Sequence, residues 1–210
     1  DEKQTFVFKK VINRSVLEVI MGEFDLMLSF VSILFGIGYS KLLNIVPYVF
    51  SKNEKTSILY QLFFIYTFAD GIVHFWGFTN AIGNQDYNFN YFLCDVSLAC
   101  FFYALCAFVS PSNFETINSW KEYFLKIRSK IWLCQILMVI NKMLLVQTVK
   151  DEALMNEVIL VVIIPWFTIS CFGFFVKNIT TQYILTIISL IHTGIAIFAT
   201  ALQDVSGLTS

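Results

Sequence analysis

The chemistry of this chain is concentrated in ionisable residues that lie inside long apolar stretches. The segment FIYTFADGIVHFWGF holds Asp70 and His74 four residues apart. On a helix, this spacing places both side chains on one face, one turn apart. A carboxylate beside an imidazole can pass a proton, bind a metal ion or form a buried ion pair. The ionisable residues that lie well inside apolar stretches are Asp70, His74, Asp95, Lys142 and His192.

Membrane-spanning helices must position these groups, because the composition is that of a membrane protein. Of the 210 residues, 57% are hydrophobic, 17% are aromatic and 14% are charged. An ordinary soluble domain has about 25% charged residues. The net charge of −1 gives no basic field for nucleic acid, so we expect no nucleic-acid partner.

Six apolar windows set the predicted fold. A helix needs about 20 apolar residues to cross the hydrocarbon core of a bilayer. The windows are 24–46, 57–79, 88–110, 131–149, 158–176 and 183–202. Short polar segments separate them, which favours antiparallel neighbours in a compact bundle. We predict an all-α polytopic membrane protein with six transmembrane helices in residues 23–204 and a short tail in 205–210.

Two further segments are amphipathic. In residues 1–22, Lys, Arg and Glu fall on one helical face and Phe, Ile and Val on the other, which predicts an interfacial helix in the headgroup plane. Its scattered charges are unlike a signal peptide. Residues 118–130 place a Trp, a Tyr and four cations before the fourth window, and we expect them to continue into it as one helix. Basic interfacial helices of this kind can bind anionic lipid or a partner protein.

The distribution of Lys and Arg predicts the orientation. Cytoplasmic loops carry an excess of these residues. They are more numerous, and better distributed, in the segments that follow the first, third and fifth windows. We therefore place loops 51–56, 111–130 and 177–182 in the cytoplasm and both termini outside, although the basic residues of 1–22 oppose this orientation.

Depth along the helices predicts that the ionisable residues meet. Asp95 and Lys142 each lie about seven residues from the ends of their windows on the same side of the membrane, or about 10 Å deep. Asp70 and His74 share that half of the membrane, and His192 lies near the middle. We expect a polar cluster in the bundle interior, with Lys142 paired with Asp95, Asp70 or both.

Two interpretations of this cluster stay open. A charged residue at the bilayer centre costs about 2.5–3.5 kcal/mol on insertion scales, so each one needs a reason. The cluster is either a structural ion pair that fixes the helices, or an ion or proton pathway in which the carboxylate and imidazoles titrate and Lys142 is the countercharge.

Small residues and a proline mark two of the windows. Ser32, Gly36 and Ser40 recur every four residues in the first window, a face along which another helix can approach closely. That face predicts packing within the chain, an oligomer seam or a pore lining. Pro165 in the fifth window should kink or loosen its helix, which makes it a candidate hinge.

Motifs for enzymes and cofactors are missing from the sequence. There is no GxSxG elbow, HExxH pair, Walker loop or dinucleotide fingerprint, so we expect no catalytic residue, metal or cofactor. An intramembrane enzyme that uses Asp70 and Asp95 as a carboxylate pair stays an alternative. The five cysteines lie inside apolar runs, where cysteine is usually a packing residue.

Four segments of the chain resemble a family of membrane proteins. They are EFDLMLSFVSILFGIGYSKLL, IVHFWGF, FFYALCAFVSP and WKEYFLKIRSKIW. Together they resemble a bacterial family of small six-span membrane proteins with a Phe-Asp start, a Gly-containing first span and a His-Phe-Trp in span two. The resemblance implies the six-span architecture and the bacterial inner membrane but no activity. Gly77, where the pattern has an aromatic, and the basic segment 1–22 depart from it.

These observations favour a channel or transporter-like membrane protein. In this hypothesis an oligomer of the chain moves protons or small ions past Asp70, His74, Asp95, Lys142 and His192, and could act as a membrane effector in bacterial defence or stress. The alternative is a scaffold or sensor without catalytic activity, which binds a partner protein and in which the cluster is purely structural.

Overall fold

The computed structural model describes the backbone of residues 2–51, 57–82, 89–114, 117–146, 156 and 158–207, and the side chains of residues 25–51, 57–78, 89–114, 117–146, 156 and 158–198. Every regular element in these ranges is a helix, which confirms the all-α prediction. The elements are α1 (Glu2–Val49), α2 (Ile58–Ile82), α3 (Phe89–Val109), α4 (Trp120–Val146), the π-helical turn η1 (Ile159–Ile163), α6 (Ile164–Phe175) and α7 (Ile179–Gly207).

Length and composition indicate an integral membrane protein. In the described part of the chain, the segments long and apolar enough to cross a membrane are Asp25–Val49, Ile58–Phe78, Phe89–Val109, Trp120–Val146 and Ile179–Phe198. The fifth predicted window becomes a shorter apolar helix, Ile159–Phe175, formed by η1 and α6. Five of the six predicted spans are therefore present as full-length helices, and the count of six stays a prediction.

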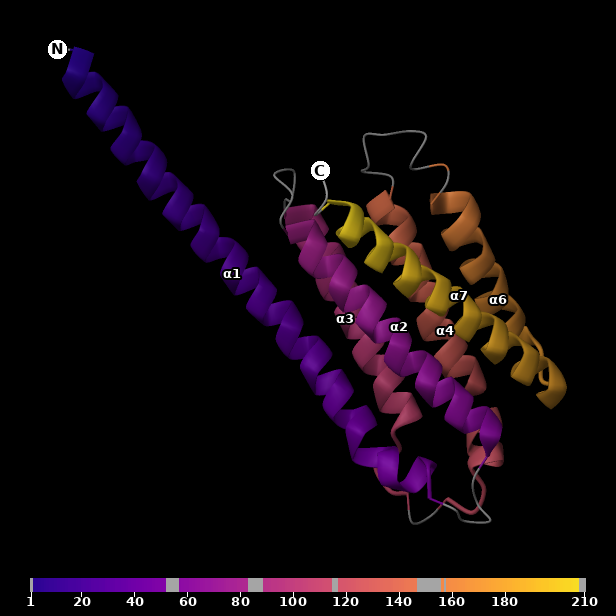
Figure 1. Cartoon of the computed structure of the whole chain (residues 1–210). Coiled ribbons are helices and arrows are strands. Elements are labelled where there is room, and N and C mark those ends of the chain that lie inside the picture. The colour runs from indigo at the N-terminus through magenta and orange to yellow at the C-terminus, as the bar shows by residue number, and fades with distance from the viewer. Residues whose placement is uncertain are drawn as a thin grey trace.

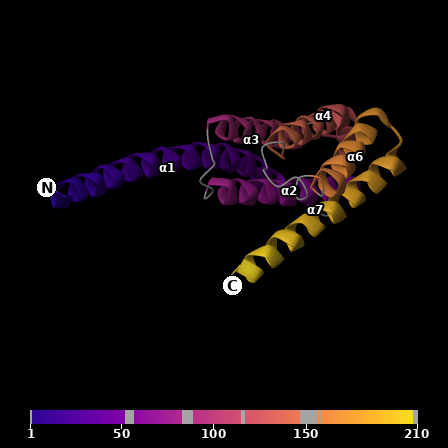
Figure 2. The same cartoon turned by 90° about the horizontal axis from the view of Figure 1, so that it is seen from above.

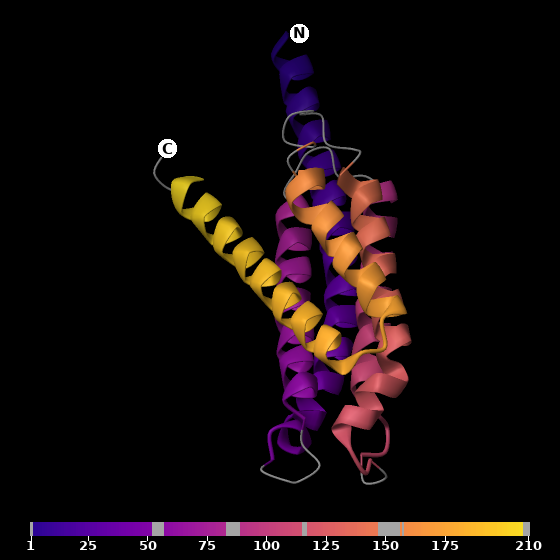
Figure 3. The same ribbon diagram turned by 90° about the vertical axis from the view of Figure 1, so that its right-hand side faces the viewer.

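The helices form a closed ring with α2 partly inside it. Around the ring, α1 packs on α3, α3 on α4, α4 on α6, α6 on α7, α7 on α2 and α2 on α1. In addition, α2 contacts α3 and α4 across the bundle. Figure 1 shows the arrangement from the side and Figure 2 from above, and Figure 3 shows α7 crossing α2 diagonally in front of it. The N- and C-termini lie toward the same end of the bundle (Figures 1 and 3).

The N-terminal region differs from the prediction. Residues 2–22 continue into the first span as one helix, and this part of α1 extends beyond the bundle (Figure 1). The interfacial helix in 1–22 is therefore not confirmed as an element of its own. In contrast, α4 joins the basic segment 120–130 to its span without a break, as expected. The side of the membrane that faces the cytoplasm stays a prediction.

Aromatic side chains and two glycines hold the bundle together. Phe63 and Trp132 are fully buried with their ring centroids 5.7 Å apart, which joins α2 to α4. A Cβ atom at Gly71 would lie 2.3 Å from Phe102, and a Cβ atom at Gly173 would lie 2.3 Å from Trp132. Both glycines therefore allow a close approach that no other residue permits.

Gly173→Ala should destabilise the bundle. Because Trp132 is rigid and fully buried, the added methyl group forces it and its neighbours to move, at a cost of about 1–3 kcal/mol. Gly194→Ala is the matched control, because a Cβ atom there meets no atom within 4 Å. Thermal unfolding in detergent should show a lower midpoint for the first variant only. Equal midpoints for both variants would contradict this packing.

Candidate functional site

The centre of the site is the predicted pair on α2. Nε2 of His74 lies 3.5 Å from Oδ1 of Asp70, and both side chains are buried, with exposed fractions of 4% and 5% for the residues. The four-residue spacing puts them on the inward face of α2, as the sequence indicated. Among the described residues, Nε2 of His74 makes no hydrogen bond, and its 3.5 Å separation from Asp70 is that of an ion pair when the imidazole is protonated.

Gln135 of α4 fixes the pair in place. Its Nε2 donates a hydrogen bond to Oδ2 of Asp70 at 3.2 Å, and its Oε1 accepts one from Nε1 of Trp166 on α6 at 2.9 Å. The indole of Trp166 in turn stacks on the His74 ring, with the centroids 5.1 Å apart. These four side chains form a closed circuit of contacts that joins α2, α4 and α6. Sequence reasoning missed Gln135 and Trp166.

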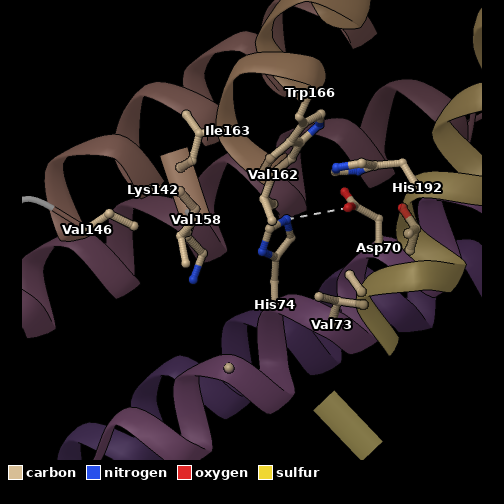
Figure 4. Close-up of a pocket in the computed structure, with 13 residues that line it drawn as sticks. Asp70, Val73, His74, Lys142, Val146, Val158, Val162, Ile163, Trp166 and His192 are labelled. Carbon is tan, nitrogen blue, oxygen red and sulfur yellow. Dashed lines mark ion pairs between the residues drawn. The ribbon is translucent and has the colours of Figure 1, made fainter. Parts of the chain in front are cut away.

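A pocket of about 200 Å³ opens beside this circuit. Asp70, His74, Lys142 and His192 all line it, so that α2, α4 and α7 each contribute an ionisable group. Figure 4 shows the His192 ring pointing toward Asp70 and Trp166 from the side of α7. The pocket reaches Val146, where α4 ends, and therefore extends toward the end of the bundle at which the chain termini lie.

The fifth predicted residue, Asp95 of α3, is buried but does not line this pocket. Asp95 is nevertheless close enough to Lys142 for an electrostatic interaction, as is Asp70. The ammonium also lies 4.0 Å from the Cβ position of Gly77, where a larger residue would crowd it. Lys142 therefore lies within electrostatic range of two carboxylates, one that lines the pocket and one outside it, and their pairing stays a prediction.

The site has a net negative charge when both imidazoles are neutral. In their ordinary ionisation states, Asp70 and Asp95 carry two negative charges and Lys142 carries one positive charge. An uncompensated charge in a low-dielectric interior is unfavourable. The site therefore favours the uptake of one proton or one small cation.

A π-helical turn forms one wall of the pocket. The turn η1 (Ile159–Ile163) lies immediately before Pro165, and the amide N–H of Ile164 bonds to the carbonyl of Ile159 rather than one residue later. π-turns are rare and often occur at functional sites. Pro165 removes a backbone donor at the start of α6, which accounts for the irregular turn. Its role as a hinge stays a prediction.

The inward face of α7 is polar along its length. Gln182, Thr186, Ser189 and Thr193 are all buried, with exposed fractions of at most 5%, and their spacing of four, three and four residues puts them on one face. Helices of soluble proteins normally bury their apolar face, whereas membrane helices can turn polar side chains toward the bundle interior. The spacing of the polar residues in 182–193 is the feature of the sequence that could have predicted this polar face.

A layer of three buried hydroxyl groups lies one helical turn from the pocket. Tyr66 of α2, Ser170 of α6 and Ser189 of α7 have exposed fractions of 1%, 0% and 1%, and their hydroxyls make no hydrogen bond to any described residue. Tyr66 is close enough to Ser189 and Trp166 to interact with both, although the geometry is not that of a hydrogen bond. A buried hydroxyl without a partner costs about 1–3 kcal/mol, so this layer calls for further partners such as water.

Beyond the hydroxyl layer, Gln182 and Arg128 complete the polar face. Gln182 accepts a hydrogen bond from Nε1 of Trp132 at 2.8 Å and donates to the carbonyls of Gly173 and Val176 at 2.9 and 2.7 Å. Arg128, which we expected in the interfacial segment, is buried and donates to the same Val176 carbonyl at 2.6 Å. Polar groups therefore continue to the end of the bundle where α6 ends and α7 begins.

The predicted small-residue face of α1 does not pack against another helix of this chain at Gly36, its middle residue. Gly36 is exposed, and a Cβ atom there would meet nothing within 4 Å. Ser32 is half-buried and Ser40 is exposed. The close approach to α3 is made at Gly38 instead, where a Cβ atom would lie 3.2 Å from Phe102. The oligomer seam at Ser32, Gly36 and Ser40 stays a prediction.

Gln135→Met should lower the thermal stability of the protein. The change leaves the carboxylate of Asp70 and the indole N–H of Trp166 without their partner, and a hydrogen bond to a charged group contributes about 1.5–3 kcal/mol. The control is Gln61→Met, because Gln61 donates only to the Val49 carbonyl near the end of α1. If both variants unfold at the same temperature, Gln135 does not hold the circuit together.

Comparison with known proteins gives no relative: no family model matches the chain, and neither does any curated protein or solved structure. Among the described residues, no three His, Cys, Asp or Glu side chains are grouped closely enough to hold a metal ion. Functional conclusions therefore depend on the geometry of the site alone.

Proposed function

We propose that this membrane protein conducts protons through the interior of its helix bundle. The observation that carries the proposal is the polar inward face of α7, which follows one side of the ionisable pocket and continues past it toward the other end of the bundle. Polar side chains inside a membrane bundle are unfavourable unless they serve packing or a pathway. An apolar inward face of α7 would have avoided the desolvation cost of burying these polar side chains.

The proposed path has three parts. Protons enter the pocket from the end of the bundle near Val146 and reach Asp70, which His74 and His192 flank. The hydroxyl layer of Tyr66, Ser170 and Ser189 follows, one turn further along α2, α6 and α7. The path then reaches Gln182 and Arg128 at the opposite end.

The dimensions favour protons over hydrated ions. The pocket has room for water molecules, but its lining includes no residue of the hydroxyl layer. Beyond it, fully buried Phe63 and Trp132 occupy the interior between α2 and α4. A proton can pass along hydroxyl groups and single waters, whereas a hydrated ion needs an open pore.

Lys142 serves as the countercharge in this proposal. With two carboxylates acting on it, the ammonium balances one of them and leaves the other able to exchange a proton. A fixed positive charge close to Asp70 also prevents a permanently protonated carboxyl group. The pocket thereby keeps one titrating acid with two imidazoles beside it.

Reconstitution tests the proposal. The purified chain is placed in liposomes with a trapped pH indicator, a potassium gradient and valinomycin, so that proton entry is driven electrically. We expect the internal pH to fall far faster than in protein-free liposomes, with no matching flux of sodium ions. A rate equal to that of protein-free liposomes, from correctly folded protein, would favour the scaffold interpretation, in which the cluster is structural.

Tyr66→Phe should slow this flux, because it removes one of the three hydroxyl groups in the layer between the pocket and Gln182. Tyr60→Phe is the matched control on the same helix, because the Tyr60 hydroxyl is equally buried but donates to the Val109 carbonyl of α3. Rates are compared per folded protein. Equal rates for the two variants would remove the hydroxyl layer from the path.

A further inference from the structure

A second hollow lies at the opposite end of the bundle from the chain termini and shares no lining residue with the pocket. Its volume is about 580 Å³, and it is formed where α3 ends and α4 begins. Pockets for small ligands commonly have volumes of about 300–1,000 Å³. The hollow is therefore large enough for a polar headgroup.

The charged groups of the hollow are those of an anion site. Lys126 and Lys130 lie one turn apart on α4, and Glu122 lies one turn before Lys126. Among the described residues that line the hollow, two ammonium groups and one carboxylate give a net charge of +1. The side chains of Ser112 and Asn118 add polar groups that can donate hydrogen bonds.

Apolar side chains line the other wall of the hollow. Phe108 of α3, Tyr123 and Ile127 all face it. The Tyr123 hydroxyl donates to the Phe108 carbonyl at 2.7 Å, and the Lys130 ammonium lies 5.4 Å from the centre of the Phe108 ring. These contacts hold the wall and one cation in fixed positions.

The level of the hollow in the membrane identifies the ligand. Apolar sequence begins directly after Lys130, and we therefore place the two lysines where α4 enters the hydrocarbon core. At this level a ligand must present an anion and an apolar group together. We propose that the hollow binds the phosphodiester headgroup of an anionic phospholipid, whose single negative charge matches the net charge of the site.

Native mass spectrometry of the full chain in neutral detergent tests this site. The probes are dioctanoyl phosphatidylglycerol, dioctanoyl phosphatidylcholine and inorganic phosphate. We expect one phosphatidylglycerol to bind about tenfold more tightly than phosphatidylcholine, and phosphate alone to bind weakly. Equal binding of the two lipids would overturn the charge match, and phosphate binding as tight as that of phosphatidylglycerol would assign the site to a free anion.

A pair of double variants localises the binding. Lys126→Gln with Lys130→Gln removes both ammonium groups of the hollow, and we expect it to weaken phosphatidylglycerol binding about tenfold. Lys121→Gln with Lys177→Gln removes the same charge from exposed positions outside the hollow and should leave binding within about twofold. The same loss in both double variants would mean general attraction to the basic surface and would overturn the proposal. Unfolding midpoints measured without lipid show that both variants are folded.

Discussion

Asp70→Asn is expected to reduce proton flux by roughly a hundredfold, the lower end of what a positioned proton-transfer group contributes. The asparagine keeps the size of the side chain, and its carbonyl oxygen can still accept the hydrogen bond from Gln135. It cannot take up or release a proton. The variant should therefore remain folded while the titrating acid of the pocket is lost.

The control for this prediction is Asp25→Asn, because Asp25 is an exposed carboxylate at the start of the membrane-spanning part of α1. This variant makes the same chemical change and should conduct at the wild-type rate. Both variants are measured in the same liposome assay after circular dichroism shows equal helix content. Wild-type flux from Asp70→Asn would place the path elsewhere in the bundle.

Lys142→Met is expected to abolish flux for a different reason. Methionine fills much of the same space but leaves two buried carboxylates without a countercharge. Both of them then hold their protons permanently, because a neutral acid is far less costly to bury than an unpaired carboxylate. The pocket loses its exchangeable proton, and the protein stays folded because the charge has been neutralised.

Thermal stability separates this outcome from a structural role. If Lys142 serves only to hold the helices through its ion pair, its removal should lower stability by about 3–5 kcal/mol, as for other broken buried pairs. Lys121→Met, at an exposed position of α4, is the control for general effects of removing a lysine. A large loss of stability together with unchanged flux in the surviving folded protein would favour the scaffold.

The sequence predicted those parts of the site that depend on local geometry. Asp70 and His74 share a face because helix periodicity requires it, and the rise per residue was enough to bring Lys142 to their level. His192 lines the same pocket although its depth was expected to differ slightly. Asp95 acts on Lys142 but lies outside the pocket, since the direction of a side chain depends on how α3 is rotated against its neighbours.

The parts that sequence reasoning missed depend on contacts between helices. Gln135 and Trp166 are ordinary residues until α4 and α6 pack against α2 and bring them to Asp70 and His74. Ser and Thr are common in membrane helices, so a spacing of polar residues on α7 did not predict burial. For the same reason, Gly36 looked like a packing position, whereas the rotation of α1 gives that role to Gly38.

The sequence predicted the helices of the fold but not all of their boundaries. Apolar windows gave the helices, because a chain in lipid must satisfy its backbone hydrogen bonds internally. The continuity of α1 from residue 2 to its span could not be predicted, since an amphipathic segment can lie on a membrane or extend a helix with the same sequence. The helix of the fifth window, Ile159–Phe175, nearly matches the predicted 158–176, but the π-turn before Pro165 could not be predicted.

The most direct test of the central claim is whether water reaches the buried hydroxyl layer. X-ray footprinting of the protein in lipid nanodiscs generates hydroxyl radicals from bound water, and mass spectrometry then locates the oxidised side chains. Tyr66 and Tyr60 each have an exposed fraction of 1%, but only the Tyr66 hydroxyl lacks a partner among the described residues. A proton path predicts that Tyr66 is oxidised while Tyr60 is protected. Equal protection of both tyrosines would show a dry bundle interior and contradict the path.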